Sequence, residues 1–182
     1  MNKNRPIQKY PIRAVAYYVE NVEATARQHS KVFGSGPFFS IPEVSGTIRL
    51  GGRDLHLNQS TAFGQWGSQM VELVQQNPGS DPLVRELFPW PPNDMIHHLA
   101  IFVDDLDRER ERLHRAGLEE IMLIQFGEGL QGSFFDTRKL YGHLIELYPA
   151  TPQMSGFFQM VSQAAADWDG EEPFRILQMP QK

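Results

Sequence analysis

Residues 14–34 read AVAYYVENVEATARQHSKVFG, and residues 98–117 read HLAIFVDDLDRERERLHRAG. The first halves of the two segments align without a gap at an offset of 84 residues, which places Ala14 on His98. In each segment an apolar run is followed by a polar residue and then by a charged stretch that ends at a glycine. Such internal similarity is the sequence signature of a repeated structural unit.

A second pair of matching segments follows in the same order. Residues 70–76, MVELVQQ, resemble residues 144–150, LIELYPA, and Glu72 aligns with Glu146. Because two matches recur in one order, we expect a module that occurs twice.

Each copy begins with a strand that leads into a helix. Residues 12–19 and 97–103 are rich in β-branched and aromatic residues, which is typical of strands. Asn21 and Asp105 are residue types favoured at helix N-caps, and a glycine ends each helix. Three extended segments separated by turns follow each helix, so the module is βαβββ. They cover roughly residues 38–50, 54–65 and 68–76 in the first copy, and 119–126, 130–137 and 143–149 in the second.

The two modules form one predicted domain over residues 12–149. The first module spans 12–76 and the second spans 96–149. A linker at 77–95 contains five prolines, and a short helix is expected in it around Leu83–Leu87. Length agrees with one domain, since a chain of 182 residues falls within the usual range of ~100–200 residues per domain.

Residues 150–182 form a C-terminal helical tail, with one amphipathic helix near 153–167. We expect Phe157, Phe158 and Val161 on its apolar side, covering a sheet edge or a partner subunit. An apolar helix of this kind favours a homodimer.

Composition excludes several classes of partner. The chain has 17 Lys and Arg against 22 Asp and Glu, a net charge of −5, which argues against nucleic acid as a partner. No run approaches the ~18–20 apolar residues that a membrane span needs, and the N-terminus has no signal-peptide pattern. There is no cysteine, so any bound metal is held by nitrogen and oxygen. A cytoplasmic protein is expected.

Strand alternation places three polar side chains on one face of the sheet. Since alternate residues share a face, Glu72, His98 and Glu146 point away from the helices, whereas His97 and His143 point toward them. Buried charges are costly unless they are paired or bound to a cation. One histidine with two carboxylates suits Mn²⁺, Fe²⁺, Co²⁺, Ni²⁺ or Zn²⁺.

Other interpretations of these three residues remain open. An interior glutamate is often paired with an arginine, and Arg49, Arg53 or Arg138 could supply that partner. A single histidine in a sheet is often a hydrogen-bonded core residue. Several aromatic residues are candidates for cavity walls or plain core: Tyr18, Phe38, Phe39, Phe63, Trp66, Phe102 and Phe134.

The segments HHLAIFVDDLD, GHLIELYP, MVELVQQ and YYVENVEATARQHSKVFGSGPFF resemble the vicinal oxygen chelate superfamily over about residues 12–150. This superfamily includes glyoxalases, bleomycin-resistance proteins and extradiol dioxygenases, and the likeness is greatest to its glyoxalase-like and methylmalonyl-CoA-epimerase-like branch. The resemblance implies an α+β fold in which two tandem βαβββ modules curl around a shared cup-shaped cavity.

The resemblance also implies a metal site with one ligand from the first and fourth strand of each module. The corresponding positions are Ala14, Glu72, His98 and Glu146. Three carry side chains that can bind a metal, but alanine stands where the family usually has histidine. The divalent ion is therefore held by three protein ligands or is absent. His56 is a candidate replacement from another strand.

The function implied is a metal-dependent lyase, isomerase or epimerase acting on a small oxygenated, hydrophobic or aromatic molecule. Glu146 would be the permanent metal ligand, and Glu72 would be a ligand or the catalytic base. Two other classes remain: a metal-free protein that sequesters a small molecule, and an Fe(II)-dependent ring-cleaving dioxygenase.

Overall fold

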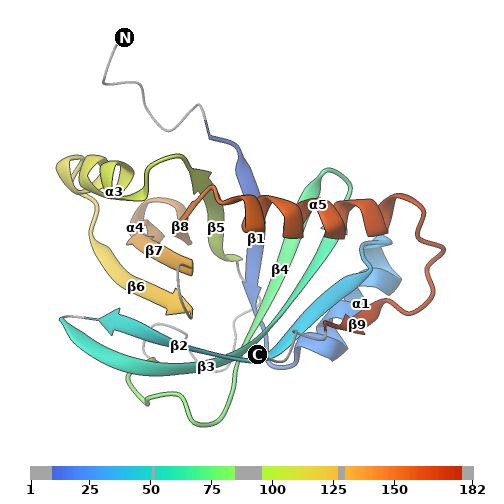
Figure 1. The fold of residues 1–182 in the computed structure, drawn as a ribbon. Helices are drawn as coiled ribbons and strands as arrows, with labels where there is room; N and C mark the ends of the chain where they lie inside the picture. The colour runs from blue at the N-terminus through green and yellow to red at the C-terminus, as the bar shows by residue number, and fades with distance from the viewer. Residues whose placement is uncertain (1–9, 51, 85–95, 127–129, 178–182) are drawn as a thin grey trace.

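The computed structural model describes residues 10–50, 52–84, 96–126 and 130–177, and shows two βαβββ units side by side (Figure 1). The first unit consists of β1 (Ile12–Tyr18), α1 (Val22–Phe33), β2 (Phe38–Leu50), β3 (Arg53–Trp66) and β4 (Gln69–Gln76). The second consists of β5 (Ile96–Val103), α3 (Leu106–Arg115), β6 (Glu120–Phe126), β7 (Leu130–Asp136), α4 (Arg138–Tyr141) and β8 (Leu144–Pro149). The short helix α4 was not expected from the sequence.

The strands form one curled sheet that closes on itself. Its order is β3-β4-β1-β5-β8-β7-β6-β2, and β2 also pairs with β3. The units meet where β1 and β5 pair antiparallel, and β2 pairs with β6 at the other junction. The predicted fold class is therefore confirmed: the structure is an α+β cup, and it closes within a single chain.

The capping residues begin the helices as expected. The Asn21 side chain accepts a hydrogen bond from the backbone N–H of Ala24 at 2.8 Å, and Asp105 accepts one from Arg108 at 3.0 Å. Gly34 follows α1 with φ of 66°, a left-handed conformation that glycine adopts without steric cost.

Helices α1 and α3 pack on the outside of the cup, against the side chains that alternation assigns to that face. Val22 and Ala26 of α1 share a buried cluster with Val71 and Leu73 of β4. The second unit repeats this packing with Leu106 and Leu113 of α3 and with Ile101, Val103, Phe135 and Leu147 of the sheet.

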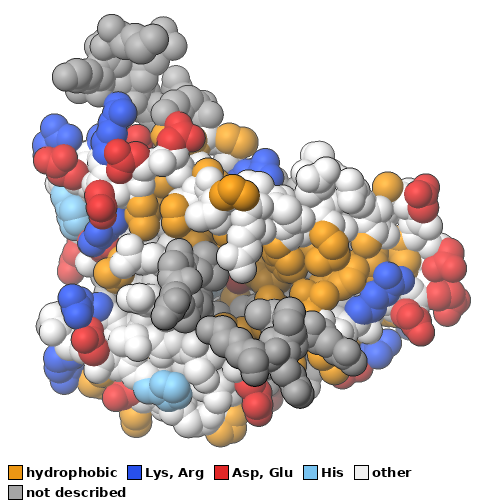
Figure 2. All heavy atoms as spheres, viewed as in Figure 1, with side chains coloured by type: hydrophobic (Ala, Val, Ile, Leu, Met, Phe, Trp, Pro, Cys, Tyr) orange, Lys and Arg blue, Asp and Glu red, His pale blue; other side chains and the backbone are white. Residues whose placement is uncertain are grey.

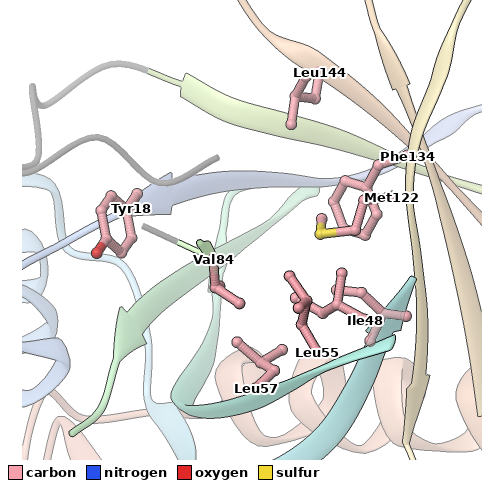
Figure 3. Close-up of a cluster of buried hydrophobic side chains, with 9 residues drawn as sticks. Tyr18, Ile48, Leu55, Leu57, Val84, Met122, Phe134 and Leu144 are labelled. Carbon is pink, nitrogen blue, oxygen red and sulfur yellow. The ribbon is translucent and has the colours of Figure 1, made fainter. Parts of the chain in front are cut away.

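Inside the cup, both units contribute to one apolar cluster (Figure 3). Side chains from β2 and β3 point toward side chains from β6 and β7, where the first unit meets the second. Val84, which follows β4, joins them and is fully buried. The cluster comprises Tyr18, Ile48, Leu55, Leu57, Val84, Met122, Ile124, Phe134 and Leu144.

The C-terminal helix α5 (Pro152–Ala166) covers the inner face of the sheet, where we expected it to cover a sheet edge or a partner. Figure 1 shows it crossing β1 and β4. Its Phe158 and Val161 are buried against Ala14, Met70 and Ala100. This packing is possible because the alanines leave room above the strands. In the space-filling view, hydrophobic side chains gather along one side of α5 (Figure 2).

After α5, the chain adds a strand that the sequence did not predict. β9 (Phe174–Ile176) pairs parallel with the first residues of β2. The expected short helix at 83–87 lies mostly outside the described residues. No helix in the described ranges is long and apolar enough to cross a membrane.

Two of the candidate wall aromatics lie outside the cup. Phe38 packs with α1, and Trp66 contacts His29 and Phe33 of α1, with ring centroids 5.2 and 5.1 Å apart. The other five candidates belong to clusters on the inner face.

Two glycine substitutions test the packing of Phe38. A Cβ at Gly64 would lie 2.7 Å from the Phe38 ring, whereas a Cβ at Gly156 in α5 meets nothing within 4 Å. We expect Gly64→Ala to lower the free energy of unfolding by ~1–3 kcal/mol. Gly156→Ala should raise it by about 1 kcal/mol, because alanine favours the helix. Urea unfolding measures both, and equal stability of Gly64→Ala and the parent protein would contradict this packing.

Candidate metal centre

Glu72 of β4, His98 of β5 and Glu146 of β8 meet inside the cup. Nε2 of His98 lies 3.0 Å from Oε2 of Glu146 and 3.4 Å from Oε2 of Glu72. One ligand atom from each residue lies within 4.8 Å of the other two. The three residues that the sequence singled out are thus brought together, and they form a group that could hold a metal ion.

The register of the strands explains how residues so far apart in the sequence meet. Ala16 of β1 pairs with Glu72 on one side and with His98 on the other. Paired residues point to the same face of a sheet, and the alanine methyl group lets the two longer side chains approach above it. Glu146 pairs in the same way with Ala100.

The centre is shielded from solvent and contains polar atoms without hydrogen bonds. The side chains of Glu72, His98 and Glu146 are 7%, 4% and 1% exposed. Although Nε2 of His98 and Oε2 of Glu146 are close, neither has a hydrogen-bond partner among the described residues. They border a cavity of about 10 Å³, close to the ~10–15 Å³ that one water molecule needs. Size and donor set therefore fit a single ion.

Burial and nearby charges together shift the pKa values of His98, Glu146 and Tyr148 at the centre. Burial opposes protonation of His98, but the charges of Glu146 and Glu72 outweigh it and raise the His98 pKa to about 10. Burial raises the pKa of Glu146. Tyr148, whose ring lies beside Gly132 with Glu146, has its pKa raised well above its ordinary value by burial and by the nearby carboxylates. An imidazolium between carboxylates is the arrangement that a divalent cation would replace.

The carboxylate of Glu146 packs against the backbone of β7 at Gly132. A Cβ at residue 132 would lie 2.9 Å from Oε1 of Glu146 and 3.1 Å from the Tyr148 ring. The absence of a side chain at this position therefore lets both groups pack close to the backbone of β7.

The fourth ligand position of the family is filled by apolar packing. Ala14 is fully buried in the cluster that Phe158 and Val161 of α5 form with the sheet. His56 does not replace the missing imidazole, because it is exposed on β3. Among the described residues, the candidate ligands at this centre are therefore Glu72, His98 and Glu146.

The structure corrects the expected orientation of His97. The β1–β5 register shifts between Ala16 and Tyr17, so β5 carries an extra residue there. This bulge turns His97 toward the cavity, where its Nδ1 lies 2.9 Å from Nδ1 of His98. A bulge inserts one residue and reverses the facing of a side chain, and strict alternation cannot detect it.

The arginines that could have paired with the interior glutamates lie elsewhere. Arg49 pairs with Asp54 at 2.8 Å, Arg138 pairs with Asp136 at 2.7 Å, and Arg53 is exposed. A different residue, His143, was expected on the outer side. Its Nδ1 lies 2.9 Å from the backbone oxygen of Leu144. The salt-bridge interpretation of Glu72 and Glu146 is therefore wrong for these arginines.

The family model of the Glyoxalase/Bleomycin resistance protein/Dioxygenase superfamily matches residues 13–134. The chain belongs to this superfamily. No curated protein matches it.

Solved structures with the glyoxalase fold resemble the chain at low sequence identity. A hypothetical protein from Bacillus halodurans C-125 has a TM-score of 0.54 and 16% identity, covering 79% of this chain and 96% of its own. Methylmalonyl-CoA epimerase from Mycobacterium tuberculosis has a TM-score of 0.52 and 18% identity, covering 80% of this chain and 91% of its own. A mutant 4-hydroxymandelate synthase from Streptomyces coelicolor has a TM-score of 0.50 and 17% identity, covering 78% of this chain and 38% of its own. These likenesses support the fold.

The protonation of His98 can be tested in the metal-free protein. Its folded pKa of about 10 lies above the ordinary 6.5, so the proton contributes stability that is complete below pH 6.5 and lost as pH rises toward 10. We expect the ¹⁵N spectrum of His98, recorded with chelator present, to show imidazolium at neutral pH. Glu146→Gln should lower this pKa, because it removes the larger charge interaction. A neutral His98 at pH 7 would contradict the charge arrangement described here.

Proposed function

We propose that this protein is a metal-dependent lyase, isomerase or epimerase that moves a proton on a small oxygenated molecule. The observation that carries the proposal is the convergence of Glu72, His98 and Glu146 in a buried cavity of single-ion size. Carboxylate and imidazole ligands suit Mn²⁺, Fe²⁺, Co²⁺, Ni²⁺ or Zn²⁺. Such an ion, when bound, supplies Lewis acidity that stabilises negative charge on a substrate oxygen.

The surroundings of the two glutamates support different roles for them. Glu146 is the more deeply buried, and its Oε1 packs closely against Gly132. These contacts restrain it and suit a permanent ligand. Glu72 lies farther from Nε2 of His98 and its side chain is less deeply buried. It is therefore the better candidate for the group that accepts a proton from a substrate carbon and returns it.

His98 and its neighbours position this chemistry. Nε2 faces the carboxylates, while Nδ1 faces His97, so both ring nitrogens contact protein groups. Phe134 packs edge-on against His98 with ring centroids 5.1 Å apart. A ring held on several sides presents its nitrogen in one direction, as a ligand or a charge-stabilising group requires.

The apolar inner surface supports a hydrophobic or aromatic substrate. Phe63 contacts Phe157 and Phe158 of α5, and Phe102 contacts Tyr148, with ring centroids 4.8–6.2 Å apart across this cluster. One structural neighbour is named methylmalonyl-CoA epimerase, and epimerisation is one of the reactions proposed here. This likeness adds branched acyl thioesters to the substrates worth testing.

A second candidate function follows from Ala14. Because apolar packing fills the fourth ligand position, the cup could bind a hydrophobic molecule without a metal and without turnover. Metal dependence separates this sequestration function from catalysis.

Metal binding tests the centre directly. Calorimetry with Mn²⁺ or Zn²⁺ should show one ion per chain, and His98→Ala and Glu146→Gln should weaken binding by roughly tenfold or more. Glu109→Gln is the matched control, because Glu109 is a buried glutamate that pairs with Arg112 outside the centre. Catalysis is followed by deuterium incorporation from D₂O into α-hydroxy ketones and 2-methyl acyl thioesters. Glu72→Gln should lower the exchange rate by ~10²–10⁴-fold with the ion still bound.

Two results would overturn the proposal. One is unchanged ion binding in both His98→Ala and Glu146→Gln. The other is binding of these compounds that is indifferent to chelator and occurs without exchange, which would favour sequestration.

We also infer a homodimer, working in the cytoplasm as expected from a chain without cysteine. Support for the dimer no longer comes from α5, since its Phe158 and Val161 are buried within the same chain. It comes from exposed apolar side chains at the end of α1 and β3, where Phe33 and Trp66 are in contact. Light scattering should give twice the chain mass, and Phe33→Asp should give the monomer. A monomeric parent protein would contradict this inference.

A further inference from the structure

The seam between β1 and β5 contains two bulges at equivalent places in the repeat. One lies between Ile12 and Ala14 and makes Arg13 the extra residue of β1, and the other makes His97 the extra residue of β5. Arg13 and His97 are related by the same offset of 84 residues that relates the two copies. Each bulge turns its extra residue to the opposite face of the sheet. In both copies this residue directly precedes a position where the superfamily has a metal ligand.

The bulge turns Arg13 to the inner face of the sheet. Its guanidinium carbon lies 5.4 Å from the ring centroid of Phe102 and 5.7 Å from that of Phe158. His97 makes the equivalent contact with Tyr18, the counterpart of Phe102, with ring centroids 6.1 Å apart. Stacking on aromatic rings holds the guanidinium plane but leaves its N–H groups available.

Arg13 borders a cavity of about 200 Å³ that is separate from the metal centre. Ser68, Gln65 and Ser162 add hydrogen-bonding groups to its wall, and Met70 and Phe158 add apolar surface. The described residues of the lining include no carboxylate. Within the described residues no ion pair involves Arg13, and its Nε atom is buried without a hydrogen-bond partner.

We propose that this cavity binds the oxyanion of a small molecule, a carboxylate or a phosphate. A guanidinium offers parallel N–H donors that match the two oxygens of such a group. Serine hydroxyl groups can donate further hydrogen bonds, and the absence of a competing carboxylate leaves the positive charge for the ligand. The cavity is far larger than the space for one water molecule, so it can admit the group together with part of its carbon skeleton.

The cavity lies on the same face of the sheet as the metal centre. Met70 precedes Glu72 by two residues on β4, a rise of ~7 Å along the strand. An anion held by Arg13 would thus lie beside the carboxylate centre. The inference goes beyond the proposed function and does not depend on a bound metal.

Calorimetry on the full chain with chelator present tests the inference, with benzoate and phenyl phosphate as probes and benzamide as the neutral control. We expect both anions, or one of them, to bind with an affinity that falls as salt rises, and benzamide not to bind. The comparison of the two anions distinguishes a carboxylate site from a phosphate site. Arg13→Gln should weaken binding by roughly tenfold or more. Arg175→Gln should leave it unchanged, because Arg175 also lies over an aromatic ring, Phe39, but outside the cavity.

A second pair of variants keeps the test valid if Arg13→Gln does not fold. Ser68 is exposed in the turn before β4, so Ser68→Asp should fold and place a negative charge in the cavity. We expect it to abolish anion binding, while Ser45→Asp on exposed β2 surface does not. Equal binding of benzamide and the anions, or full binding by Ser68→Asp, would overturn the inference. Neither result bears on metal binding by Glu72, His98 and Glu146, which is measured separately.

Discussion

Burial of two carboxylates and one imidazole on the inner wall of the cup is the constraint around which the rest of this structure is arranged. The side chains of Glu146 and His98 are 1% and 4% exposed, and such groups destabilise a fold unless they are paired or bind a cation. Their mutual contacts supply part of the compensation. The β2–β6 pairing closes the sheet, and the apolar cluster fills the inside of the cup. Both features keep water away from the three polar side chains. Fold and chemistry are therefore not separable here.

The sequence predicted which side chains face the interior, because strand periodicity is a local property. Glu72, His98 and Glu146 share a face in the structure as alternation requires. Their convergence could not be derived in this way, since it depends on register across three strand pairs and on the small side chains of Ala16 and Ala100 between them. The repeat pointed to a shared centre because Glu72 and Glu146 occupy equivalent positions in two similar modules.

Local sequence patterns failed where a single residue altered the backbone path or where a long-range contact decided the outcome. The bulge at His97 reverses a side chain that alternation assigned to the outer face, and an equivalent bulge occurs at Arg13. The position of α5 depends on its fit over Ala14, Met70 and Ala100, which are far from it in sequence. An amphipathic pattern shows that a helix has an apolar face, but it does not identify the surface that this face will cover.

The alanine at position 14 has a consequence for the symmetry of the molecule. Two copies that fold alike have here become unequal partners: the second presents an imidazole at the position where the first presents a methyl group and the anchorage of a helix. Duplication makes such a division of labour accessible. Here the second unit supplies His98 and Glu146 to the shared centre, whereas the first supplies Glu72 alone and uses the space above Ala14 to hold α5.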